Sequence, residues 1–533
     1  MNATRSIAPV KASGLRQLTF SLLRYWPVFL LCSLTALALL WQLGKSSLLS
    51  WDEAIYAQVS KEMVQSGNWL TPHWQYKPWF HKPPLLMWLT AIFFSLFGIS
   101  EFWSRAASAF SGIGVIVTTY LVGKFVYDTG VGFSAAVVLL TSVYFVEYAR
   151  FGTIDIMLTL FTLLAVYAYL RLGQGSQRWW YIIFSSCALA VMAKGTAGVI
   201  APAAIGLALL LDRRLAAALR SRHFWQGLLL AFAIVAPWHI IMYMQHGQRF
   251  LSEYLGFHVI ARATRALEGH TGGRFYYIVK LQNEFSPWFY LVPFVLASSI
   301  NENIKGRARS RLLLLVTVLV FALYTSVQTK LDWYILPLCP ALAILVAAML
   351  VHAIKSSKSI EFSGLVVAAC AVALIAPVKI VLAFGCLGLL VVILCLATKK
   401  LAYQPAAVVM CAFLVVVGLN TLRPIYRRGE EPVARLARIA GSTNPGDREP
   451  LIVFLKSEPP ASYSHPAALF YSNRPILLAR NMEDVASFTK DHQIKRIITD
   501  KEDLESLSMN YEVHVEAESK PDIYATIKLN SDR

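Results

Sequence analysis

Apolar runs of about the length needed to cross a membrane recur along the chain from Val28 to Leu419. A backbone removed from water must satisfy its own hydrogen bonds, so runs of this kind fold as membrane-spanning helices. The composition agrees, because 56% of the 533 residues are hydrophobic and 15% are charged, whereas soluble domains carry about 25% charged residues. The predicted fold class is an α-helical polytopic membrane protein.

The net charge of +18 is the one feature that would suggest a nucleic-acid partner. The Lys and Arg residues lie in short loops between the apolar runs, where they orient a membrane protein with its basic loops in the cytoplasm. A basic stripe with interleaved stacking aromatics, typical of a nucleic-acid surface, does not occur. We therefore expect membrane lipids among the partners and exclude nucleic acid.

Basic residues also set the topology. Those between Arg5 and Arg24 place the N-terminus in the cytoplasm, and Trp26–Leu43 is expected to be a retained first span. The next apolar run, Leu85–Ile99, is short for a span. If it crossed the membrane, the basic loops Asp212–His223 and Lys305–Arg311 would lie outside. We therefore expect it to lie along the outer surface.

This assignment gives thirteen spans within residues 1–420, with external loops at 45–105 and 244–286. After the first, the expected spans are 106–124, 132–149, 155–172, 179–194, 197–211, 224–243, 287–300, 312–327, 333–351, 361–378, 380–398 and 404–420. Residues 421–533 are then external, although three arginines follow the last span. Long tails translocate largely regardless of charge.

The tail, residues 421–533, changes to the pattern of a small soluble α/β domain. Helices are expected at Pro432–Gly441 and Asp484–His492, and strands at Leu451–Leu455, Arg496–Thr499, Tyr511–Val515 and Ile523–Leu529. This region contains no glycine-rich phosphate loop and no metal-ligand spacing.

The first external loop carries the most informative polar residues. Asp52 and Glu53 stand where the hydrocarbon ends, with Tyr56 one helical turn further on, and His81 and Lys82 precede a Pro-Pro pair. The plain alternative for the two acids is a helix cap with a first-turn acid. A carboxylate at a membrane boundary facing a cation is instead suited to handling a charged group carried on a lipid.

The topology brings further polar residues to the same external side: Arg150, Asp155, Lys194, His258, Arg262, Arg265, His270, Lys330 and Tyr334. Single basic residues at span ends often only snorkel to the headgroups, and the two histidines of the second loop are also compatible with ordinary loop residues. Snorkelling does not explain acids gathered on the same side as the bases. His81, His258 and an acid would allow a divalent-metal site, although their spacing matches no local metal motif.

These residues resemble a known pattern, that of the bacterial aminoarabinose transferases among the polyprenyl-phosphate-sugar-dependent glycosyltransferases of the GT-C superfamily. The matching segments are Asp52–Gln58, Lys77–Leu85, Ala149–Asp155, Ala193–Thr196, Pro237–His239 and Lys330–Pro337. The resemblance implies thirteen spans, juxtamembrane helices in the first external loop and a small periplasmic domain. It also implies donor-phosphate contacts at Lys82 and Tyr334, sugar or acceptor contacts near Tyr56, and essential acids at Asp52 and Asp155.

Two positions depart from the family pattern. The family usually has Glu before Lys-Pro-Pro, where this chain has His81, and Glu-His-x-x-Arg-Phe in the second loop, where this chain has Phe257-His258 and a displaced Arg262. The sequence therefore assigns no cofactor and leaves a divalent metal at these positions as an alternative.

The function expected from this resemblance is inverting transfer of a sugar, 4-amino-4-deoxy-L-arabinose or a related sugar, from a polyprenyl-phosphate donor to lipid A or another envelope acceptor at the periplasmic face of a bacterial inner membrane. Lys82, with Arg262 or Arg265 and Tyr334, would stabilise the departing phosphate. The alternatives are a flippase of lipid-linked sugars, a ligase that uses pyrophosphate donors, and a related transferase acting on another glycan or a protein. A flippase would place polar residues near the bilayer midplane.

Overall fold

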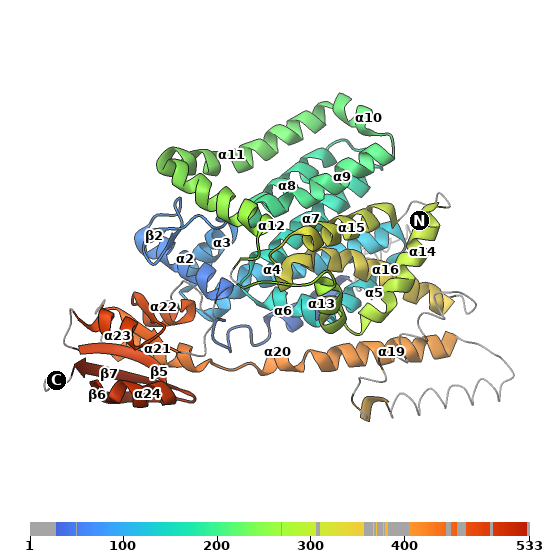
Figure 1. The fold of residues 1–533 in the computed structure, drawn as a ribbon. Helices are drawn as coiled ribbons and strands as arrows, with labels where there is room; N and C mark the ends of the chain where they lie inside the picture. The colour runs from blue at the N-terminus through green and yellow to red at the C-terminus, as the bar shows by residue number, and fades with distance from the viewer. Residues whose placement is uncertain are drawn as a thin grey trace, which may run out of the picture.

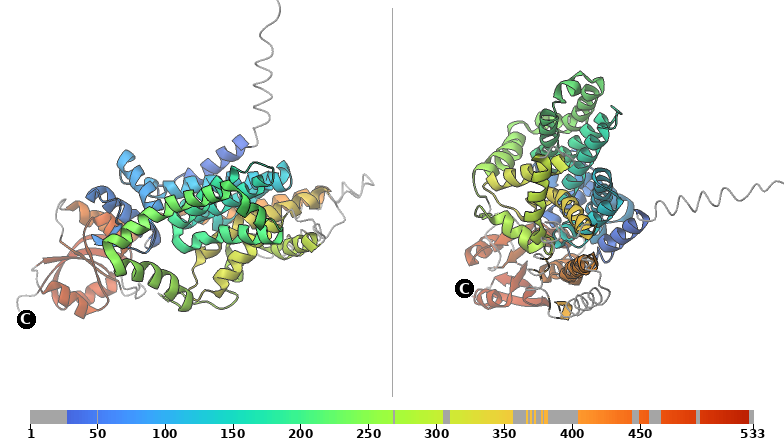
Figure 2. Two further views of the ribbon diagram at one scale, coloured as in Figure 1. Left: turned by 90° about the horizontal axis from the view of Figure 1, so that it is seen from above. Right: turned by 90° about the vertical axis from the view of Figure 1, so that its right-hand side faces the viewer.

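The computed structural model has a large helical body with a smaller C-terminal unit at one end (Figures 1 and 2). It describes residues 28–49, 51–267, 269–304, 310–355, 404–443, 449–455, 465–490 and 494–529, with a few isolated positions between 356 and 403. The spans expected at 361–378 and 380–398 lie almost wholly outside the described residues, as do the basic residues before Trp26.

The body begins with a helix at Val28–Leu40, followed by α2 (Asp52–Ser66) and a short hairpin of β1 (His73–Trp74) and β2 (Lys77–Pro78). The next helices are α3 (Leu85–Phe97), α4 (Glu101–Val126), α5 (Thr129–Leu140), α6 (Val143–Arg150), α7 (Ile154–Leu172), α8 (Trp179–Lys194), η1 (Gly195–Val199), α9 (Ile200–Leu211), α10 (Leu215–Arg220) and α11 (Arg222–Leu251). They are followed by η2 (Ser252–Ala261), α12 (Arg262–Thr264), α13 (Tyr276–Glu284), η3 (Trp288–Leu291), α14 (Val292–Ile304), α15 (Arg311–Ser326), η5 (Asp332–Leu338), α16 (Cys339–Lys355), α19 (Gln404–Thr421) and α20 (Arg423–Arg427).

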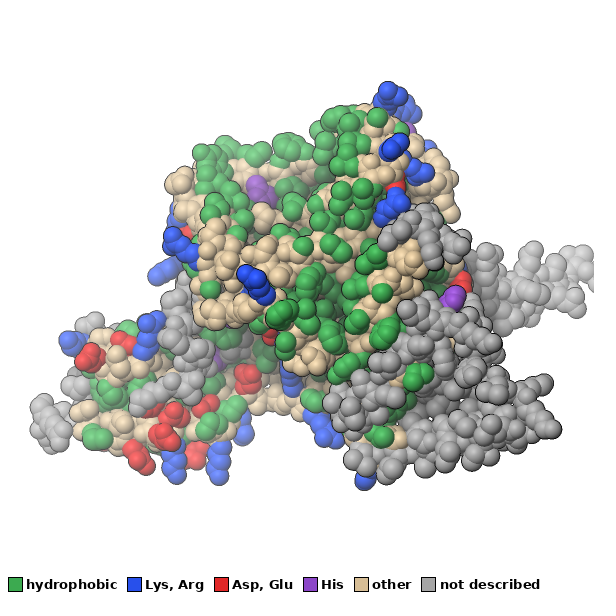
Figure 3. Space-filling view, turned by 45° about the vertical axis from the view of Figure 1, so that its right-hand side comes forward, with side chains coloured by type: hydrophobic (Ala, Val, Ile, Leu, Met, Phe, Trp, Pro, Cys, Tyr) green, Lys and Arg blue, Asp and Glu red, His purple; other side chains and the backbone are tan. Residues whose placement is uncertain are grey.

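The chain is a multi-pass membrane protein. Within the described residues, five helical stretches are long and apolar enough to cross a membrane, or six if one bent pair is a single span. The five are Glu101–Val126, Ile154–Leu172, Trp179–Leu211, Arg222–Thr264 and Asp332–Ile354. Hydrophobic side chains cover much of the face of the body shown in Figure 3, as expected for a surface against lipid. The expected total of thirteen spans stays a prediction.

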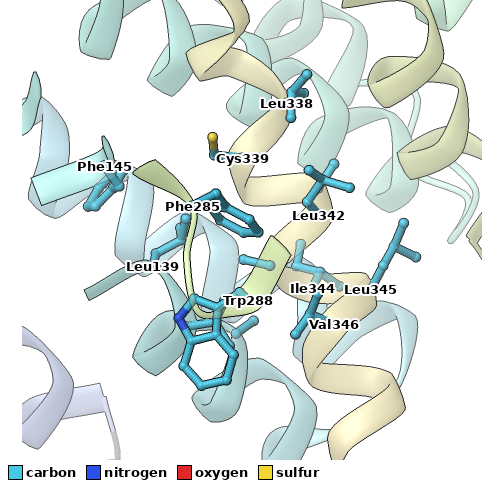
Figure 4. Close-up of a cluster of buried hydrophobic side chains, with 14 of the residues drawn as sticks. Leu139, Phe145, Phe285, Trp288, Leu338, Cys339, Leu342, Ile344, Leu345 and Val346 are labelled. Atoms are coloured by element: carbon cyan, nitrogen blue, oxygen red, sulfur yellow. The ribbon is translucent and has the colours of Figure 1, made fainter. Parts of the chain in front are cut away.

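The segment expected as a span at 132–149 is not one continuous helix, because α5 and α6 are bent by 70° at the break between them. Thr141 lies at this break, and its Oγ1 accepts a hydrogen bond of 3.0 Å from the indole of Trp288. Trp288 and Phe285 pack in the core against α16 residues such as Leu342 (Figure 4). A tertiary contact therefore fixes a bend that the apolar pattern does not reveal.

Much of the segment expected as the second external loop, residues 244–286, is helical. The helical path of α11 continues past the expected end of its span, bends at Gly247 (φ 53°), and passes through the π-helical η2 to Thr264. Gly tolerates such a positive φ without strain. Helix α11 is thus longer than expected, and its extension carries Arg262 toward the rest of the external side.

The C-terminal unit, residues 432–529, contains a five-stranded mixed sheet in the order β4-β3-β5-β7-β6. Its elements are α21 (Pro432–Thr443), β3 (Leu451–Phe454), α22 (Pro466–Ser472), β4 (Ile476–Ala479), α23 (Met482–Thr489), β5 (Ile494–Asp500), α24 (Lys501–Ser508), β6 (Tyr511–Ser519) and β7 (Asp522–Leu529). β3 pairs in parallel with β4 and β5, whereas β7 is antiparallel to both of its neighbours. The helix expected at 484–492 begins two residues earlier, capped by the side chain of Asn481. The sequence analysis missed α22, β4 and α24.

Candidate active site

Helix α2 carries two polar side chains of the site. The helix begins at Asp52, and the hydroxyl of Tyr56 donates to Asp52 Oδ2 at 3.3 Å, as the i, i+4 spacing allows. Tyr56 is buried, and burial together with the negative charges of Asp52 and Asp155 raises the pKa of its phenol well above 10. Tyr56 therefore keeps its proton and acts as a hydrogen-bond donor.

A buried ion pair joins the beginning of α7 to the end of α8. Lys194 donates to Asp155 Oδ1, and the two side chains are 5% and 1% exposed. The Lys194 ammonium also lies 4.7 Å from the centre of the Tyr334 ring, which η5 supplies. Gly195 turns the chain directly after Lys194 with φ 61°, and a side chain there would meet the Tyr254 hydroxyl. The position of Lys194 thus depends on glycine at 195.

Lys82 lies where the two carboxylates and the other cations converge. Its electrostatic neighbours are Arg262, Lys194, Asp52 and Asp155. Burial, together with the two neighbouring cations, lowers the pKa of the Lys82 amine to about 8. Three positive groups therefore share one partly enclosed region with two acids, an arrangement suited to an anion.

Four rings line this region. Tyr56 meets Trp79 edge-on, with centroids 6.3 Å apart, Trp79 lies 4.8 Å from His81, and His81 lies 4.0 Å from His258. Burial and the cations Lys82 and Arg262 lower the pKa of His81 to about 3, so its imidazole is neutral. The sequence analysis did not single out Trp79, although this residue lies in the Lys77–Leu85 segment that carried the resemblance.

The two histidines provide at most two nitrogen ligands for a metal. Among the described residues, no group of three or more His, Cys, Asp or Glu side chains is arranged to hold an ion. Both ring nitrogens of His258 are buried without a hydrogen-bond partner. The side chains present therefore do not form the three-ligand set typical of a protein metal site.

Glu53 belongs to the framework behind the site. Its carboxylate pairs with Arg105 of α4 at 2.7 Å and also accepts hydrogen bonds from the backbone amides of Leu49 and Gly152, at 2.8 and 2.9 Å. Glu53 is 3% exposed. The structure thus assigns this predicted substrate-binding residue to anchoring the loops before Asp52 and Asp155.

Arg150 and Lys330 bind backbone carbonyls. The Arg150 guanidinium donates to the carbonyls of Ala38 and Leu39, each at 3.0 Å. Lys330 donates to the carbonyls at the end of α15, including that of Thr325 at 2.6 Å. Cations at helix C-termini satisfy carbonyls that lack helical partners. Both residues stabilise helix ends rather than face Lys82.

Arg265 and His270 have exposed side chains. Their backbones hold the second external loop to the segment before η5, because Thr329 Oγ1 donates to the Arg265 carbonyl at 2.8 Å and the Lys330 amide donates to the His270 carbonyl at 3.1 Å.

Of the predicted site residues, the structure brings together eight: Asp52, Tyr56, His81, Lys82, Asp155, Lys194, His258 and Arg262, with Tyr334 beside Lys194.

Comparison with known proteins gives two kinds of match in sequence. Residues 81–241 match the family described as dolichyl-phosphate-mannose-protein mannosyltransferase. The chain is 30% identical over 355 residues to the undecaprenyl phosphate-alpha-4-amino-4-deoxy-L-arabinose arabinosyl transferase of Pseudomonas savastanoi, and 30% identical over 348 residues to that of Shewanella sediminis. The resemblance to the aminoarabinose transferases is confirmed. These matches cover 65% and 61% of this chain. They cover 66% and 60% of the two relatives, so a substantial part of each relative lies outside the matched region.

The fold has a solved counterpart. The crystal structure of ArnT from Cupriavidus metallidurans bound to undecaprenyl phosphate matches 94% of this chain and 98% of its own, with a TM-score of 0.69 and 20% sequence identity. At this identity the likeness shows the fold alone. The chain therefore has the fold of that protein.

Proposed function

We propose that this chain is a membrane glycosyltransferase that moves a sugar, 4-amino-4-deoxy-L-arabinose or a related sugar, from a polyprenyl-phosphate donor to lipid A or another envelope glycan. The observation that carries the proposal is the convergence of Lys82, Lys194 and Arg262 with Asp52 and Asp155. The name of the Pseudomonas savastanoi relative and the undecaprenyl phosphate bound in the Cupriavidus metallidurans structure support the same donor class.

The cations would act on the leaving group. When the bond between the anomeric carbon and the phosphate oxygen breaks, the electron pair stays on the phosphate, whose negative charge grows. Lys82 and Arg262 face this charge, and Tyr334 donates a hydrogen bond to it. Each fixed donor of this kind is typically worth about 3 kcal/mol in the transition state.

The carboxylates would act on the sugar and the acceptor. A phosphate acceptor on lipid A is ionised near neutral pH and needs positioning rather than a base. Asp52 and Asp155 then bind the amino and hydroxyl groups of the sugar and favour the positive charge that develops at the anomeric carbon. A hydroxyl acceptor would instead require Asp52 as general base. Direct displacement in one step inverts the anomeric configuration.

The proposed mechanism uses no metal, because Lys82 and Arg262 supply the charge that a metal would otherwise supply. A metal held by His81 and His258 would need further ligands from outside the described cluster. We expect that dialysis against EDTA leaves the transfer rate unchanged, measured against enzyme to which zinc or magnesium is returned. A loss of activity that metal restores would contradict this part of the proposal.

We place the site and the C-terminal unit on the periplasmic side of a bacterial inner membrane, with thirteen spans in residues 1–420. Cysteines introduced at two exposed positions test this topology, Lys77 near the site and Arg213 in the basic loop after α9. In intact spheroplasts an impermeant maleimide should label Lys77→Cys, whereas Arg213→Cys should react only after lysis. Labelling of Lys77→Cys only after lysis would overturn the arrangement.

The activity test is a reconstituted transfer. The purified chain, in detergent with phospholipid, is given undecaprenyl-phosphate aminoarabinose and lipid A, and the product is identified by mass spectrometry. We expect a mass increase of one sugar on lipid A, lost in Asp52→Asn. Full activity of Asp52→Asn would contradict the assigned role of this residue.

A protein acceptor is the second candidate, favoured by the mannosyltransferase family match at 81–241. The same assay with a periplasmic protein extract in place of lipid A distinguishes the two acceptors. Transfer to protein with none to lipid A would select the second candidate. Consumption of a pyrophosphate-linked donor in place of the monophosphate would indicate a ligase.

A further inference from the structure

Helix α2 presents two opposite faces. Asp52 and Tyr56 lie on the face toward the site, whereas Ala54, Ala57 and Lys61 point the other way. Lys61 follows Asp52 by nine positions, which at 3.6 residues per turn corresponds to about two and a half turns. The two side chains therefore lie on opposite sides of the helix. We call the face that carries Asp52 and Tyr56 the catalytic face, and the face that carries Ala54, Ala57 and Lys61 the structural face.

The C-terminal unit covers that structural face. Ala54 and Ala57 form one buried cluster with Ala467 and Phe470 of α22, a helix more than 400 residues further along the chain. Figure 1 shows α22 next to α2 at the edge of the helical body. Alanines on both sides let the two helix backbones approach closely. The contact is therefore specific packing between distant parts of the chain.

Lys61 crosses this contact. Its ammonium donates to the carbonyl oxygen of Phe470 at 2.6 Å and lies 4.9 Å from the centre of the Phe470 ring. The side chain is buried, with the residue 7% exposed. Phe470 lies in the last turn of α22, where carbonyls lack helical partners and a cation is favourable.

Tyr471 adds a second connection. Its hydroxyl accepts the backbone N–H of Leu48 at 2.8 Å and donates to the Glu101 carboxylate at 3.1 Å. Arg438 of α21 donates to the same carboxylate at 2.8 Å and lies over the Tyr471 ring. These bonds hold the residues just before α2 and the beginning of α4 to the C-terminal unit.

The N-terminus of α2 lacks a side-chain cap, and the Glu53–Arg105 pair anchors the connection that leads into it. Trp51, the residue before the helix, has φ 84° and makes no side-chain capping bond. The orientation of Asp52 and Tyr56 therefore depends on this pair and on packing at both faces of α2. One face rests on Trp79, Met87 and Met157, and the other on α22.

We propose that the C-terminal unit is a positioning element of the active site, in which α22, through Lys61, holds α2 so that Asp52 and Tyr56 face Lys82. Lys61 is a positioning residue, because it acts on the reacting groups only through α2. The inference rests on the proposed function for the role of Asp52. It predicts an effect on kcat from a residue on the far side of the helix.

The experiment uses the full-length protein and compares Lys61→Met, which keeps the side-chain length and removes the ammonium, with Lys61→Arg, which keeps a donor. Lys501→Met, at an exposed lysine on α24, is the matched control. We expect Lys61→Met to lower kcat roughly 10- to 100-fold, as small misplacements of reacting groups do. The Kd for undecaprenyl phosphate, which lacks the sugar that Asp52 would bind, should change little, since the proposed phosphate contacts lie outside α2.

Hydrogen–deuterium exchange of residues 52–66 gives a readout independent of activity. In Lys61→Met these amides should exchange faster, and Lys61→Arg should restore both exchange and kcat, while Lys501→Met should match the wild type. Tyr471→Phe is a milder variant that keeps the ring, with an expected loss in kcat of roughly 2- to 10-fold for the lost hydrogen bonds.

Wild-type kcat in Lys61→Met, or a fall in kcat with unchanged exchange in α2, would overturn the positioning role. If Lys61→Met does not fold, Tyr471→Phe decides the question by the same two readouts. Full activity of Asp52→Asn would instead count against the proposed function, and faster exchange in Lys61→Met would then still support the contact between α22 and α2.

Discussion

Asp155 and Lys194 illustrate how single residues of this site differ from ordinary ion pairs. Both side chains are almost fully buried at the ends of two apolar helices, where desolvating two charges costs several kcal/mol for each ion. Well-packed apolar residues would serve stability at least as well. The pair is therefore best explained by a need for charge close to Lys82 and Tyr334.

The pair can be tested by removing its members separately and together. Asp155→Asn or Lys194→Met alone leaves one buried charge without its partner, and we expect a loss of about 3–5 kcal/mol in stability. The double variant should recover much of that loss but no transfer activity, as measured by thermal unfolding and the lipid A assay. Activity that returns together with stability would assign the pair a purely structural role.

Lys82 makes the reaction sensitive to alkaline pH. Burial, Arg262 and Lys194 lower the pKa of its amine to about 8 in the free protein, so the ammonium is present below this pH and is lost above it. We expect kcat/KM for the donor to fall as the pH rises through about 8. The profile of kcat should shift to higher pH, because a bound phosphate favours the charged amine.

Lys61 has a pKa near the same value, so its titration must be separated from that of Lys82. The Lys61→Arg variant keeps a cation behind α2 throughout the range, and its kcat/KM should show the same decline. A flat profile up to pH 10 in this variant would contradict the role of Lys82.

At the scale of elements, Glu53 and Arg105 connect α2, α4 and the loop before α7. Arg105 donates to Glu53 and to the carbonyls of Leu43, Ser46 and Ser47, so it fixes the whole connection into α2. Glu53 accepts the amide of Gly152, three residues before Asp155. One buried pair thus sets the relative positions of Asp52 and Asp155.

Arg105→Met leaves the Glu53 carboxylate buried without its cation, and we expect the protein to lose about 3–5 kcal/mol of stability. Thermal unfolding in detergent measures the change. Arg249→Ala is the matched control, because its pair with Glu253 is exposed, and such i, i+4 pairs are worth about 0.3–0.5 kcal/mol. Equal melting temperatures for the two variants would show that Glu53 and Arg105 do not form the expected framework.

At the scale of the whole molecule, two surfaces of different chemistry meet near α2. The helical body shows much hydrophobic surface, whereas acidic and basic side chains both gather on the C-terminal unit (Figure 3). On the proposed function, a polyprenyl carrier would approach the site from the lipid side, and its charged headgroup would remain at the water boundary.

Binding of the carrier should stabilise the whole fold. A ligand at 100 times its Kd adds about 2.7 kcal/mol, so undecaprenyl phosphate should raise the melting temperature of the wild type. The rise should disappear in Lys82→Met and persist in Lys501→Met. A similar rise in Lys82→Met would indicate that the phosphate binds elsewhere.

Much of this protein can be read from local pattern. Apolar run length predicts the spans because the bilayer has a fixed thickness, and the polar residues Asp52, Lys82 and Asp155 were identifiable because charge at a span end is costly. Alternation of apolar residues likewise predicted β6 and β7 in the tail. These features depend on neighbours in the sequence and on the solvent.

Only the tertiary structure decided which polar residues face one another. Glu53 and Asp52 are adjacent in sequence, yet helix geometry directs one to Arg105 and the other toward Lys82. Lys330 is enclosed by the carbonyls of α15, and the α5–α6 bend depends on Trp288, contributed from a distant segment. The contact of α22 with α2 joins residues more than 400 positions apart. Such pairings arise from packing across the fold, which no local periodicity encodes.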